Sequence, residues 1–254
     1  MTQRIVITAG AAGIGRAVAD AFLADGARVA ICDIDASAVA DFQATHPNAI
    51  AHVADVTSEA QMGAFFDVVE AEFGGADVVF ANAGTSGPAG LIEDLEFADW
   101  QACLAANVNG AFLTCRWAAR VMRPAGKGLI VLTSSTAGQF GYPFRSPYAT
   151  AKWGIIGLMK TLAMELGPAG IRVNAICPGA VEGARMDHVI AIESATRGVS
   201  PDAFRAQYVA GTSLKTWINA GDLAAMIRFL ASDAGAKISG QALAIDGHTE
   251  TLDP

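Results

Sequence analysis

The sequence predicts an α/β fold in which one parallel β-sheet carries helices on both of its faces. Short, β-branched apolar segments alternate with longer amphipathic segments along the whole chain. Of the 254 residues, 52% are apolar and only 17% are charged, which suits strands that are buried on both sides. No linker rich in Pro, Gly and Ser interrupts the alternation, so we expect a single domain over residues 1–254.

Seven segments have the length and composition of strands, and amphipathic helical segments connect them. The predicted strands are Arg4–Thr8, Arg28–Cys32, Ile50–Val53, Val78–Ala81, Leu129–Thr133, Arg172–Ile176 and Ala242–Ile245. The predicted helices are Ile14–Ala24, Ala36–Ala44, Ser58–Phe73, Phe97–Met122, Ser146–Leu166 and Gly221–Ser232. Because each strand is followed by a helix, neighbouring strands are expected to run parallel, with helices on both faces of a doubly wound sheet.

Residues 180–220 depart from this alternation. No strand is expected there, and the sequence is typical of a weakly amphipathic helix with loops, inserted before the last helix and strand. An insertion at the carboxyl end of a sheet can cover a binding site and contribute to specificity. We therefore expect a substrate lid at about residues 180–220; the alternatives are an oligomer contact and a simple packing helix.

Charge and cysteine usage disfavour several classes of function. The formal net charge is −8 and no block of Lys and Arg occurs, which argues against a nucleic-acid or anionic-membrane surface. No stretch approaches the roughly 18 apolar residues that a membrane span needs, and the N-terminus enters a strand-like segment without a secretory leader. The four cysteines lack metal-ligand spacing and are expected to be small buried residues. We expect a cytoplasmic protein without a metal, nucleic-acid or membrane partner.

The first predicted strand runs into a turn of small residues, Thr8-Ala9-Gly10-Ala11-Ala12-Gly13-Ile14-Gly15, and a helix follows. Such a turn lets backbone N–H groups approach a pyrophosphate at the positive helix N-terminus. Asp33 follows Gly15 by eighteen residues, where a carboxylate would accept the ribose hydroxyls of NAD and repel a 2′-phosphate. Asp33 could instead cap the next helix, but Asp35 can fill that role. The sequence therefore favours NAD as the cofactor.

Tyr148 and Lys152 stand four residues apart on a predicted helix that Ser146 is expected to cap, with Pro147 in the first turn. This spacing places the phenol and the ammonium on one helical face. A free tyrosine has a pKa near 10, and a neighbouring ammonium lowers that pKa by favouring the phenolate. The pair is therefore a candidate proton-transfer site, although Y-x-x-x-K also occurs by chance on surface helices.

Together these features resemble the short-chain dehydrogenase/reductase family, and the resemblance covers nearly the whole chain. The glycine-rich turn resembles T-G-x-x-x-G-x-G, with Ala9 in place of the first glycine. Asn82-Ala83-Gly84 resembles the family motif N-N-A-G, with Ala81 in place of the first Asn. The resemblance implies a Rossmann-type dehydrogenase fold with a Y-x-x-x-K active site.

The resemblance also implies roles for single residues. Ser135, thirteen residues before Tyr148, would hold the substrate oxygen, and Ser134 would be a packing neighbour. Asn107 would hold a water next to the lysine in a proton relay, and Asn109 would be structural. The implied catalytic residues are Asn107, Ser135, Tyr148 and Lys152. The implied cofactor-binding residues are Thr8, Gly10, Gly13, Ile14, Gly15, Asp33, Asp55, Val56, Asn82, Ala83, Gly84, Tyr148, Lys152, Pro178, Gly179 and Val181.

Two positions in the C-terminal half of the chain depart from the family pattern. Gly183 stands where the family often has a Thr that bonds the carboxamide of the cofactor, five residues after Pro178. Asp246-Gly247-His248 resembles a D-G-G turn in which His248 replaces the second glycine. At Gly183, another backbone or side-chain donor must hold the carboxamide.

Substrate contacts are expected from the loop between Ser135 and Tyr148 and from the predicted lid. The expected substrate-binding residues are Ser135, Gln139, Tyr142 and Arg185, with Phe144, Glu182, His188 and Trp217 as further candidates. Arg185 suggests an anionic substrate, unless it forms a local ion pair with Glu182. The mixture of polar and aromatic residues favours a small hydroxylated compound, such as a sugar, polyol or hydroxy acid.

The sequence thus predicts an NAD-dependent oxidoreductase that interconverts a secondary alcohol and a ketone. The resemblance further implies a homotetramer or homodimer that pairs helices Phe97–Met122 and Ser146–Leu166 across subunits. One alternative is an NADPH-dependent carbonyl reductase, such as a 3-oxoacyl reductase, which Asp33 disfavours. Another is a nucleotide-binding protein without catalysis, which the presence of Ser135, Tyr148 and Lys152 disfavours.

Overall fold

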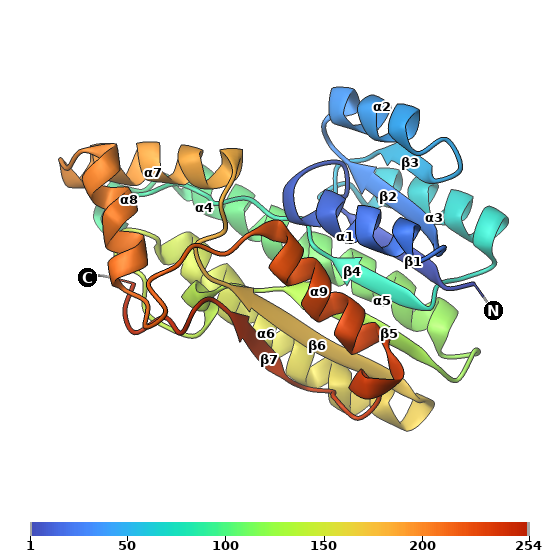
Figure 1. The fold of residues 1–254 in the computed structure, drawn as a ribbon. Helices are drawn as coiled ribbons and strands as arrows, with labels where there is room; N and C mark the ends of the chain where they lie inside the picture. Colours follow the sequence, from blue (N-terminus) through green and yellow to red (C-terminus); the bar gives the residue numbers. More distant parts are fainter. Residues whose placement is uncertain (1, 253–254) are drawn as a thin grey trace.

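The computed structural model describes residues 2–252 and contains one seven-stranded parallel sheet of order β3-β2-β1-β4-β5-β6-β7 (Figure 1). The strands are β1 Arg4–Thr8, β2 Arg28–Asp33, β3 Ile50–Val53, β4 Val78–Ala81, β5 Gly128–Thr133, β6 Ile171–Pro178 and β7 Ala242–Ile245. All neighbouring strands pair in parallel. The predicted fold class is confirmed, and β2, β5 and β6 are slightly longer than the sequence predicted.

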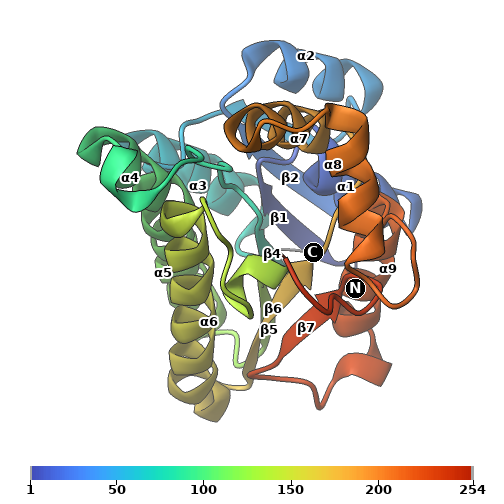
Figure 2. The ribbon, with the colours of Figure 1, turned by 90° about the vertical axis from the view of Figure 1, so that its left-hand side faces the viewer.

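Helices cover both faces of the sheet (Figure 2). One face carries α1 Gly13–Ala24, α2 Ala36–Thr45 and α9 Ala220–Ala231, and the other carries α3 Glu59–Phe73, α5 Gly110–Met122 and α6 Ser146–Leu166. The helix α4 Phe97–Leu104 continues through a π-helical turn, Ala105–Asn109, into α5. Short 3₁₀ turns lie at Ile92–Asp94, Thr136–Gly138, Gly167–Ala169 and Asp233–Gly235.

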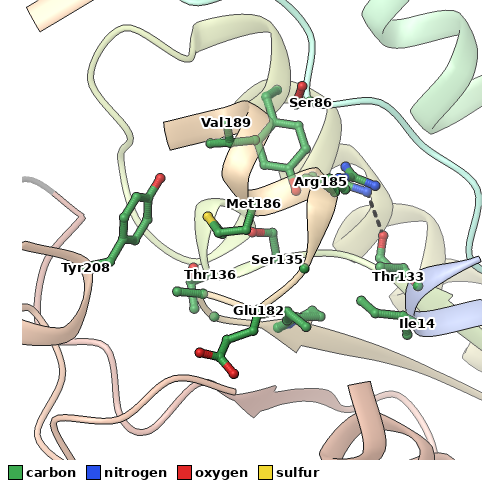
Figure 3. A pocket seen from close by; sticks show the side chains of 18 of the residues that line it. Ile14, Ser86, Thr133, Ser135, Thr136, Glu182, Arg185, Met186, Val189 and Tyr208 are labelled. Carbon is green, nitrogen blue, oxygen red and sulfur yellow. Dashed lines mark hydrogen bonds between the residues drawn. The ribbon is translucent and has the colours of Figure 1, made fainter. Parts of the chain in front are cut away.

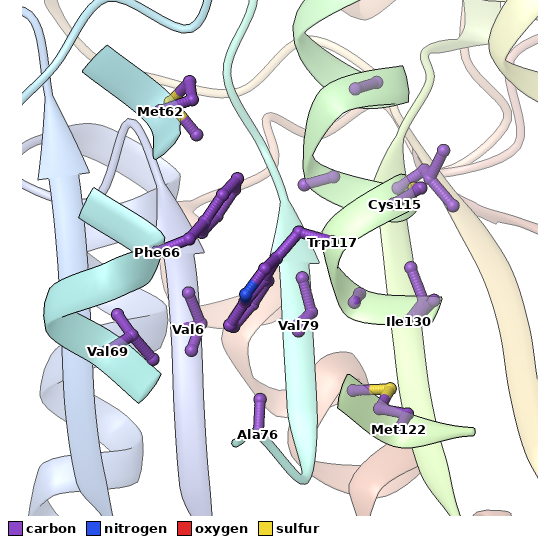
Figure 4. Close-up of a cluster of buried hydrophobic side chains, with 14 of the residues drawn as sticks. Val6, Met62, Phe66, Val69, Ala76, Val79, Cys115, Trp117, Met122 and Ile130 are labelled. Carbon is purple, nitrogen blue, oxygen red and sulfur yellow. The ribbon is translucent and has the colours of Figure 1, made fainter. Parts of the chain in front are cut away.

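The core on the α3–α5–α6 face is built from strand residues in register. Val6 of β1 pairs with Val79 of β4, and Val79 pairs with Ile130 of β5, so their side chains form one buried row. Phe66 of α3 stacks on Trp117 of α5 above this row, with ring centroids 4.4 Å apart (Figure 4). Aromatic stacking of this kind contributes roughly 0.5–1.5 kcal/mol beyond the burial of area. This layer fixes α5 and α6, which carry catalytic candidates.

The strand order reverses between β1 and β4, and this reversal opens a crevice at the carboxyl ends of the strands. Thr8, the last residue of β1, joins the two strands at that point. Its hydroxyl accepts hydrogen bonds from the backbone N–H groups of Asn82 at 3.0 Å and Ala83 at 3.1 Å. The glycine-rich turn and the Asn82-Ala83-Gly84 segment are therefore held against each other.

Two predictions on helix capping have opposite outcomes. The Asp35 carboxylate accepts hydrogen bonds from the Ser37 and Ala38 backbone N–H groups and caps α2, as predicted. The prediction that Ser146 caps α6 is wrong, because Arg145 occupies the N-cap position. The Arg145 carbonyl already accepts the Ala149 N–H at 2.9 Å, so the helical ladder begins one residue earlier and Ser146 lies inside the first turn.

Residues 180–220 form two helices, α7 Ala184–Arg197 and α8 Pro201–Ala210, where the sequence predicted one. Gly198, with φ of 68°, ends α7, and the Ser200 hydroxyl caps α8 by accepting the Ala203 N–H. No extended strand is present between residues 181 and 219, although Val181 forms an isolated parallel bridge with Ile218. Both helices lie over the carboxyl ends of the strands (Figures 1 and 2).

Candidate active site

A cavity of about 400 Å³ lies between the carboxyl ends of the strands and the helices α7 and α8 (Figure 3). Asp33 of β2 lies on its wall together with Gly13 and Ile14, the first residues of α1. The wall also contains Tyr148 and Lys152 of α6. The cavity therefore connects the predicted cofactor turn to the predicted proton-transfer pair.

Tyr148 lies at the cavity wall one helical turn before Lys152. Burial raises the pKa of the phenol, but the positive charges of Lys152 and Arg185 and hydrogen bonding with Ser135 lower it and outweigh the burial. The net result is a Tyr148 pKa below the ordinary value near 10. A lowered pKa makes the phenolate more accessible, and the phenolate can accept a proton from an alcohol.

Lys152 is buried, with an exposed fraction of 2%. Its ammonium donates a hydrogen bond to the Thr133 carbonyl at 2.9 Å and lies 5.5 Å from the centroid of the Tyr148 ring. Burial lowers the pKa of this amine, while the Tyr148 phenolate raises it. The neighbouring Ser134 hydroxyl donates to the Lys152 carbonyl at 2.8 Å and thus supports the helix rather than the reaction.

Asn107 lies in the π-helical turn between α4 and α5. Its amide donates hydrogen bonds to the Cys103 carbonyl at 2.9 Å and to the Thr85 carbonyl at 3.0 Å. The Oδ1 atom is buried and has no hydrogen-bond partner among the described protein atoms. Asn109 is exposed. Only the first of the two asparagines therefore offers a buried acceptor near the site.

The glycine-rich turn is tightly folded, and its residues Ala9, Ala12, Gly13 and Ile14 line the cavity. A methyl group on Gly15 would lie 2.0 Å from the Ala9 carbonyl oxygen, so only glycine fits there. Gly13 has φ of 54°, and Ala9 takes the same left-handed region at φ of 50° although it replaces a family glycine. The Asp33 carboxylate accepts the Ala11 N–H at 3.1 Å, which places it beside the turn. These residues fit the dinucleotide that the sequence predicts.

Several predicted cofactor residues support the cavity from behind its wall. Thr8 joins β1 to β4 as described above, and the Asp55 carboxylate accepts the backbone and hydroxyl hydrogens of Thr57. Val56 packs against Gly110, where a methyl group would lie 2.8 Å from the valine side chain. The predicted cofactor residues that line the cavity are Gly13, Ile14, Asp33, Asn82, Tyr148, Lys152, Pro178, Gly179 and Val181. Those outside its lining are Thr8, Gly10, Gly15, Asp55, Val56, Ala83 and Gly84.

The predicted substrate contacts are only partly brought together. Ser135, Tyr142 and Arg185 line the cavity, as does the further candidate Glu182. Gln139 does not line it, because it follows the 3₁₀ turn Thr136–Gly138, which ends against α6. The further candidates outside the lining are Phe144, His188 and Trp217.

The alternative of an ion pair between Arg185 and Glu182 is wrong for the described structure. Arg205 of α8 takes both nearby carboxylates, that of Glu182 at 3.7 Å and that of Asp187 at 2.8 Å. The Arg185 guanidinium instead donates to the Gly84 carbonyl at 3.1 Å. Arg185 therefore lies against the strand ends beside the Tyr148 site.

A buried polar cluster in the cavity roof was missed by the sequence reasoning. Arg145 and Glu193, with exposed fractions of 3% and 0%, form an ion pair, and Arg145 also donates to the Ser86 carbonyl at 2.6 Å. The hydroxyl of Tyr142 donates to the Glu193 carboxylate at 2.9 Å and also contacts the Tyr208 hydroxyl. No signal in the sequence links residues so far apart along the chain.

Comparisons with known proteins agree with this architecture. The family described as Enoyl-(Acyl carrier protein) reductase matches residues 9–248. Momilactone A synthase from Oryza sativa subsp. japonica is 38% identical over 250 residues, covering 95% of this chain and 88% of that protein. D-beta-hydroxybutyrate dehydrogenase from Rhizobium meliloti (strain 1021) is 33% identical over 254 residues, covering 97% and 98%. The structure of NAD+-bound xylitol dehydrogenase superposes with a TM-score of 0.91 at 29% identity, covering 96% and 98%.

None of the helices within residues 2–252 has the length and apolar character needed to span a bilayer. Within the same residues, no three side chains of His, Cys, Asp or Glu are grouped to hold a metal ion. From the extent of the family match and the identity to its curated relatives, the chain belongs to the short-chain dehydrogenase/reductase family.

Proposed function

We propose that this protein is an NAD-dependent oxidoreductase that interconverts a secondary alcohol and a ketone. The observation that carries the proposal is the placement of Tyr148 on the cavity wall, between the buried Lys152 ammonium and Ser135, with a lowered pKa. The substrate is a small polar hydroxylated compound of the sugar, polyol or hydroxy-acid class. The named activities of the relatives, on D-beta-hydroxybutyrate and xylitol, support this substrate class.

NAD would be held along the wall from the glycine-rich turn to the carboxyl end of β6. Gly13 and Ile14 lie at the positive N-terminus of α1, which suits the pyrophosphate. The Asp33 carboxylate suits the adenosine ribose, and Pro178 and Gly179 suit the nicotinamide end. When bound, NAD supplies a ring that accepts a hydride from the carbinol carbon.

The protein's own side chains carry the proton. The Ser135 hydroxyl orients the substrate oxygen, and the Tyr148 phenolate accepts the proton of the substrate hydroxyl as the carbon–hydrogen bond breaks. Lys152 stabilises the phenolate by its charge and stays fixed through its bond to the Thr133 carbonyl. Asn107 lies near Lys152 and would hold the water of the proton relay that the family resemblance implies. In the ketone-reducing direction, the Tyr148 hydroxyl returns the proton through the same contacts.

A screen of alcohols tests the proposal. Sugars, polyols and hydroxy acids are incubated with the purified protein and either NAD or NADP, and reduced cofactor is followed by absorbance. We expect turnover with NAD for at least one compound. Tyr148→Phe should reduce that turnover by about 10²–10⁴-fold, while calorimetry still detects NAD binding. Near-normal turnover of the variant would remove Tyr148 from the mechanism.

We further propose that residues 180–220 act as a substrate lid, since α7 and α8 lie over the cavity.

We also propose that the protein is a cytoplasmic homotetramer or homodimer. Large apolar side chains are exposed on the helices expected to pair, namely Phe97, Phe112, Trp153 and Met164. The four cysteines are buried free thiols, which suits a reducing compartment. Light scattering of the purified protein should give a mass that is a multiple of the 26.1 kDa chain; a stable monomer would contradict the assembly.

A further inference from the structure

The reacting end of the cavity has an excess of positive charge. Arg145 and Lys152 lie 5.2 and 5.5 Å from the centroid of the Tyr148 ring, and Arg185 lines the same cavity beside Gly84. The charges of all three lower the pKa of Tyr148. Lys152 is balanced by the Tyr148 phenolate whenever the latter forms. Arg145 is balanced by Glu193 in the buried ion pair. Of these three cations, Arg185 is the one that has no anionic partner among the described residues.

The donors of Arg185 are largely uncommitted. Its hydrogen bond goes to a neutral backbone carbonyl, that of Gly84. The carboxylates nearest to it in the chain, Glu182 and Asp187, both pair with Arg205. No carboxylate within residues 2–252 forms a salt bridge with Arg185. A guanidinium has five N–H donors in a fork that matches a carboxylate, so one bond leaves most of its capacity unused.

Several polar side chains of the roof are already engaged with other protein groups, and the Glu182 carboxylate pairs with Arg205, while Gln207 also lines the cavity. The Tyr142 and Tyr208 hydroxyls are bonded to Glu193 and to each other. Beside them, the apolar side chains of Met186 and Val189 also line the cavity (Figure 3). Hydroxyl groups of a sugar or polyol that lay against Met186 and Val189 would be left unpaired, and unpaired polar groups are costly to bury. A short hydrocarbon chain ending in an acidic group fits the wall better.

We propose that the substrate is a short hydroxy acid whose carboxylate binds Arg185 while its hydroxyl lies at Ser135 and Tyr148. This inference rests on the proposed dehydrogenase function and narrows its substrate class. Pyrophosphate of the cofactor would be the other anion within reach of the cavity. It is expected at the N-terminus of α1, whereas Arg185 lies against Gly84 at the reacting end, so we assign Arg185 to the substrate.

The first test compares hydroxy acids with their neutral analogues. Racemic and enantiopure 2- and 3-hydroxy acids of short chain length are assayed with NAD against the corresponding amides and methyl esters. We expect kcat/KM for the best acid to exceed that for its amide by about 10- to 100-fold, the range for hydrogen bonds to a charged group. Arg185→Met should remove this preference, and Arg185→Lys should retain part of it.

Lys215→Met is the matched control, because it removes one positive charge from the same lid at an exposed residue outside the cavity lining, whose ammonium donates to the Ala210 carbonyl. It should leave the ratio of acid to amide unchanged. If wild-type protein uses acid and amide equally well, or Arg185→Met lowers both equally, the assignment of Arg185 is overturned. Oxidation of polyols but no acids would also overturn it while leaving the dehydrogenase function intact.

A binding measurement keeps the test independent of turnover. Butyrate and butyramide are titrated by calorimetry into the protein saturated with NAD, in wild-type and Arg185→Met forms. We expect butyrate to bind more tightly than butyramide, and only in the wild type. Equal binding of both would overturn the inference. So would a loss of NAD affinity in Arg185→Met comparable to the loss of acid affinity, because Arg185 would then serve the cofactor. Failure of the dehydrogenase function would appear separately, as no reduction of NAD by any alcohol.

Discussion

Gly84 faces Asn107 so closely that a methyl group on Gly84 would lie 2.4 Å from the Asn107 Oδ1 atom. The same methyl group would lie 3.3 Å from the Lys152 ammonium. The absence of a side chain at position 84 thus lets the buried Asn107 acceptor lie close to the Lys152 ammonium. Both groups are polar partners of the relay that the family resemblance implies.

Gly84→Ala should therefore slow the reaction by displacing the Asn107 amide from its position beside Lys152. We expect kcat to fall by about tenfold or more, within the roughly 10²–10⁴-fold that positioned proton transfer contributes, and the solvent isotope effect on kcat to rise. Gly63→Ala in α3 is the control, because a methyl group there meets no atom within 4 Å. An unchanged kcat and isotope effect in Gly84→Ala would exclude a proton route through Asn107.

The pH dependence should report the pKa of Tyr148. Alcohol oxidation requires the phenolate, so kcat/KM should increase as the pH rises through the Tyr148 pKa, and this limb should lie below the ordinary value near 10. Lys152→Met removes the cation that lowers the pKa most, so its limb should move to higher pH. The profile is measured with one substrate and saturating NAD. A limb at the same pH in both proteins would assign it to another group.

Asp33 should set the preference between the two dinucleotides. Asp33→Ala is expected to raise the KM for NAD by roughly 10- to 100-fold, the range for hydrogen bonds to a charged group, with a smaller change for NADP. Asp35→Ala is the control: loss of the α2 cap should lower the free energy of unfolding by about 1 kcal/mol without altering the NAD to NADP ratio. Equal losses for both cofactors in Asp33→Ala would refute a contact with the ribose.

Ala9 should carry a cost in stability. At φ of 50° an L-residue with a side chain is less favourable than glycine by about 1–2 kcal/mol. Because glycine loses about 0.5–1 kcal/mol more on ordering, we expect Ala9→Gly to raise the free energy of unfolding by up to about 1 kcal/mol. Ala17→Gly within α1 should lower it by a similar amount. Urea unfolding followed by tryptophan fluorescence measures both, and a destabilised Ala9→Gly protein would contradict the strain.

The regular part of the fold could be predicted because its signals are local. Strands such as β1 consist of consecutive apolar residues that are buried on both faces of the sheet, as Ile5, Val6 and Ile7 are. The segments between the strands have apolar residues at the spacing of an α-helix. The ends of the strands could not be predicted to the residue, because contacts with neighbouring strands determine where each strand ends. β6, for example, extends to Pro178, which pairs with Ile245 of β7, and no feature near residue 176 reveals that partner.

The site divides in the same way. Tyr148, Lys152 and Asp33 were found because their spacing within one element or beside one turn fixes their geometry. Arg145 and Glu193 were missed, since their contact depends on the path of α7 across the roof. Whether Arg185 pairs with Glu182 could not be predicted either. The answer depends on Arg205 of α8, which pairs with the carboxylates of Glu182 and Asp187.

The two ends of α7 are anchored very differently, and this difference determines how substrate can enter. Glu193, near the C-terminal end of α7, is tethered to the loop before α6 by a buried ion pair, and removing one partner of such a pair costs about 3–5 kcal/mol. At the N-terminal end the contacts are exposed, namely the hydrogen bond from Arg185 to the Gly84 carbonyl and the ion pair of Asp187 with Arg205, and exposed pairs contribute only about 0–1 kcal/mol. We therefore expect the first turn of α7 to move away from the sheet while the C-terminal part of the helix stays in place. This motion would open the cavity to solvent beside Arg185.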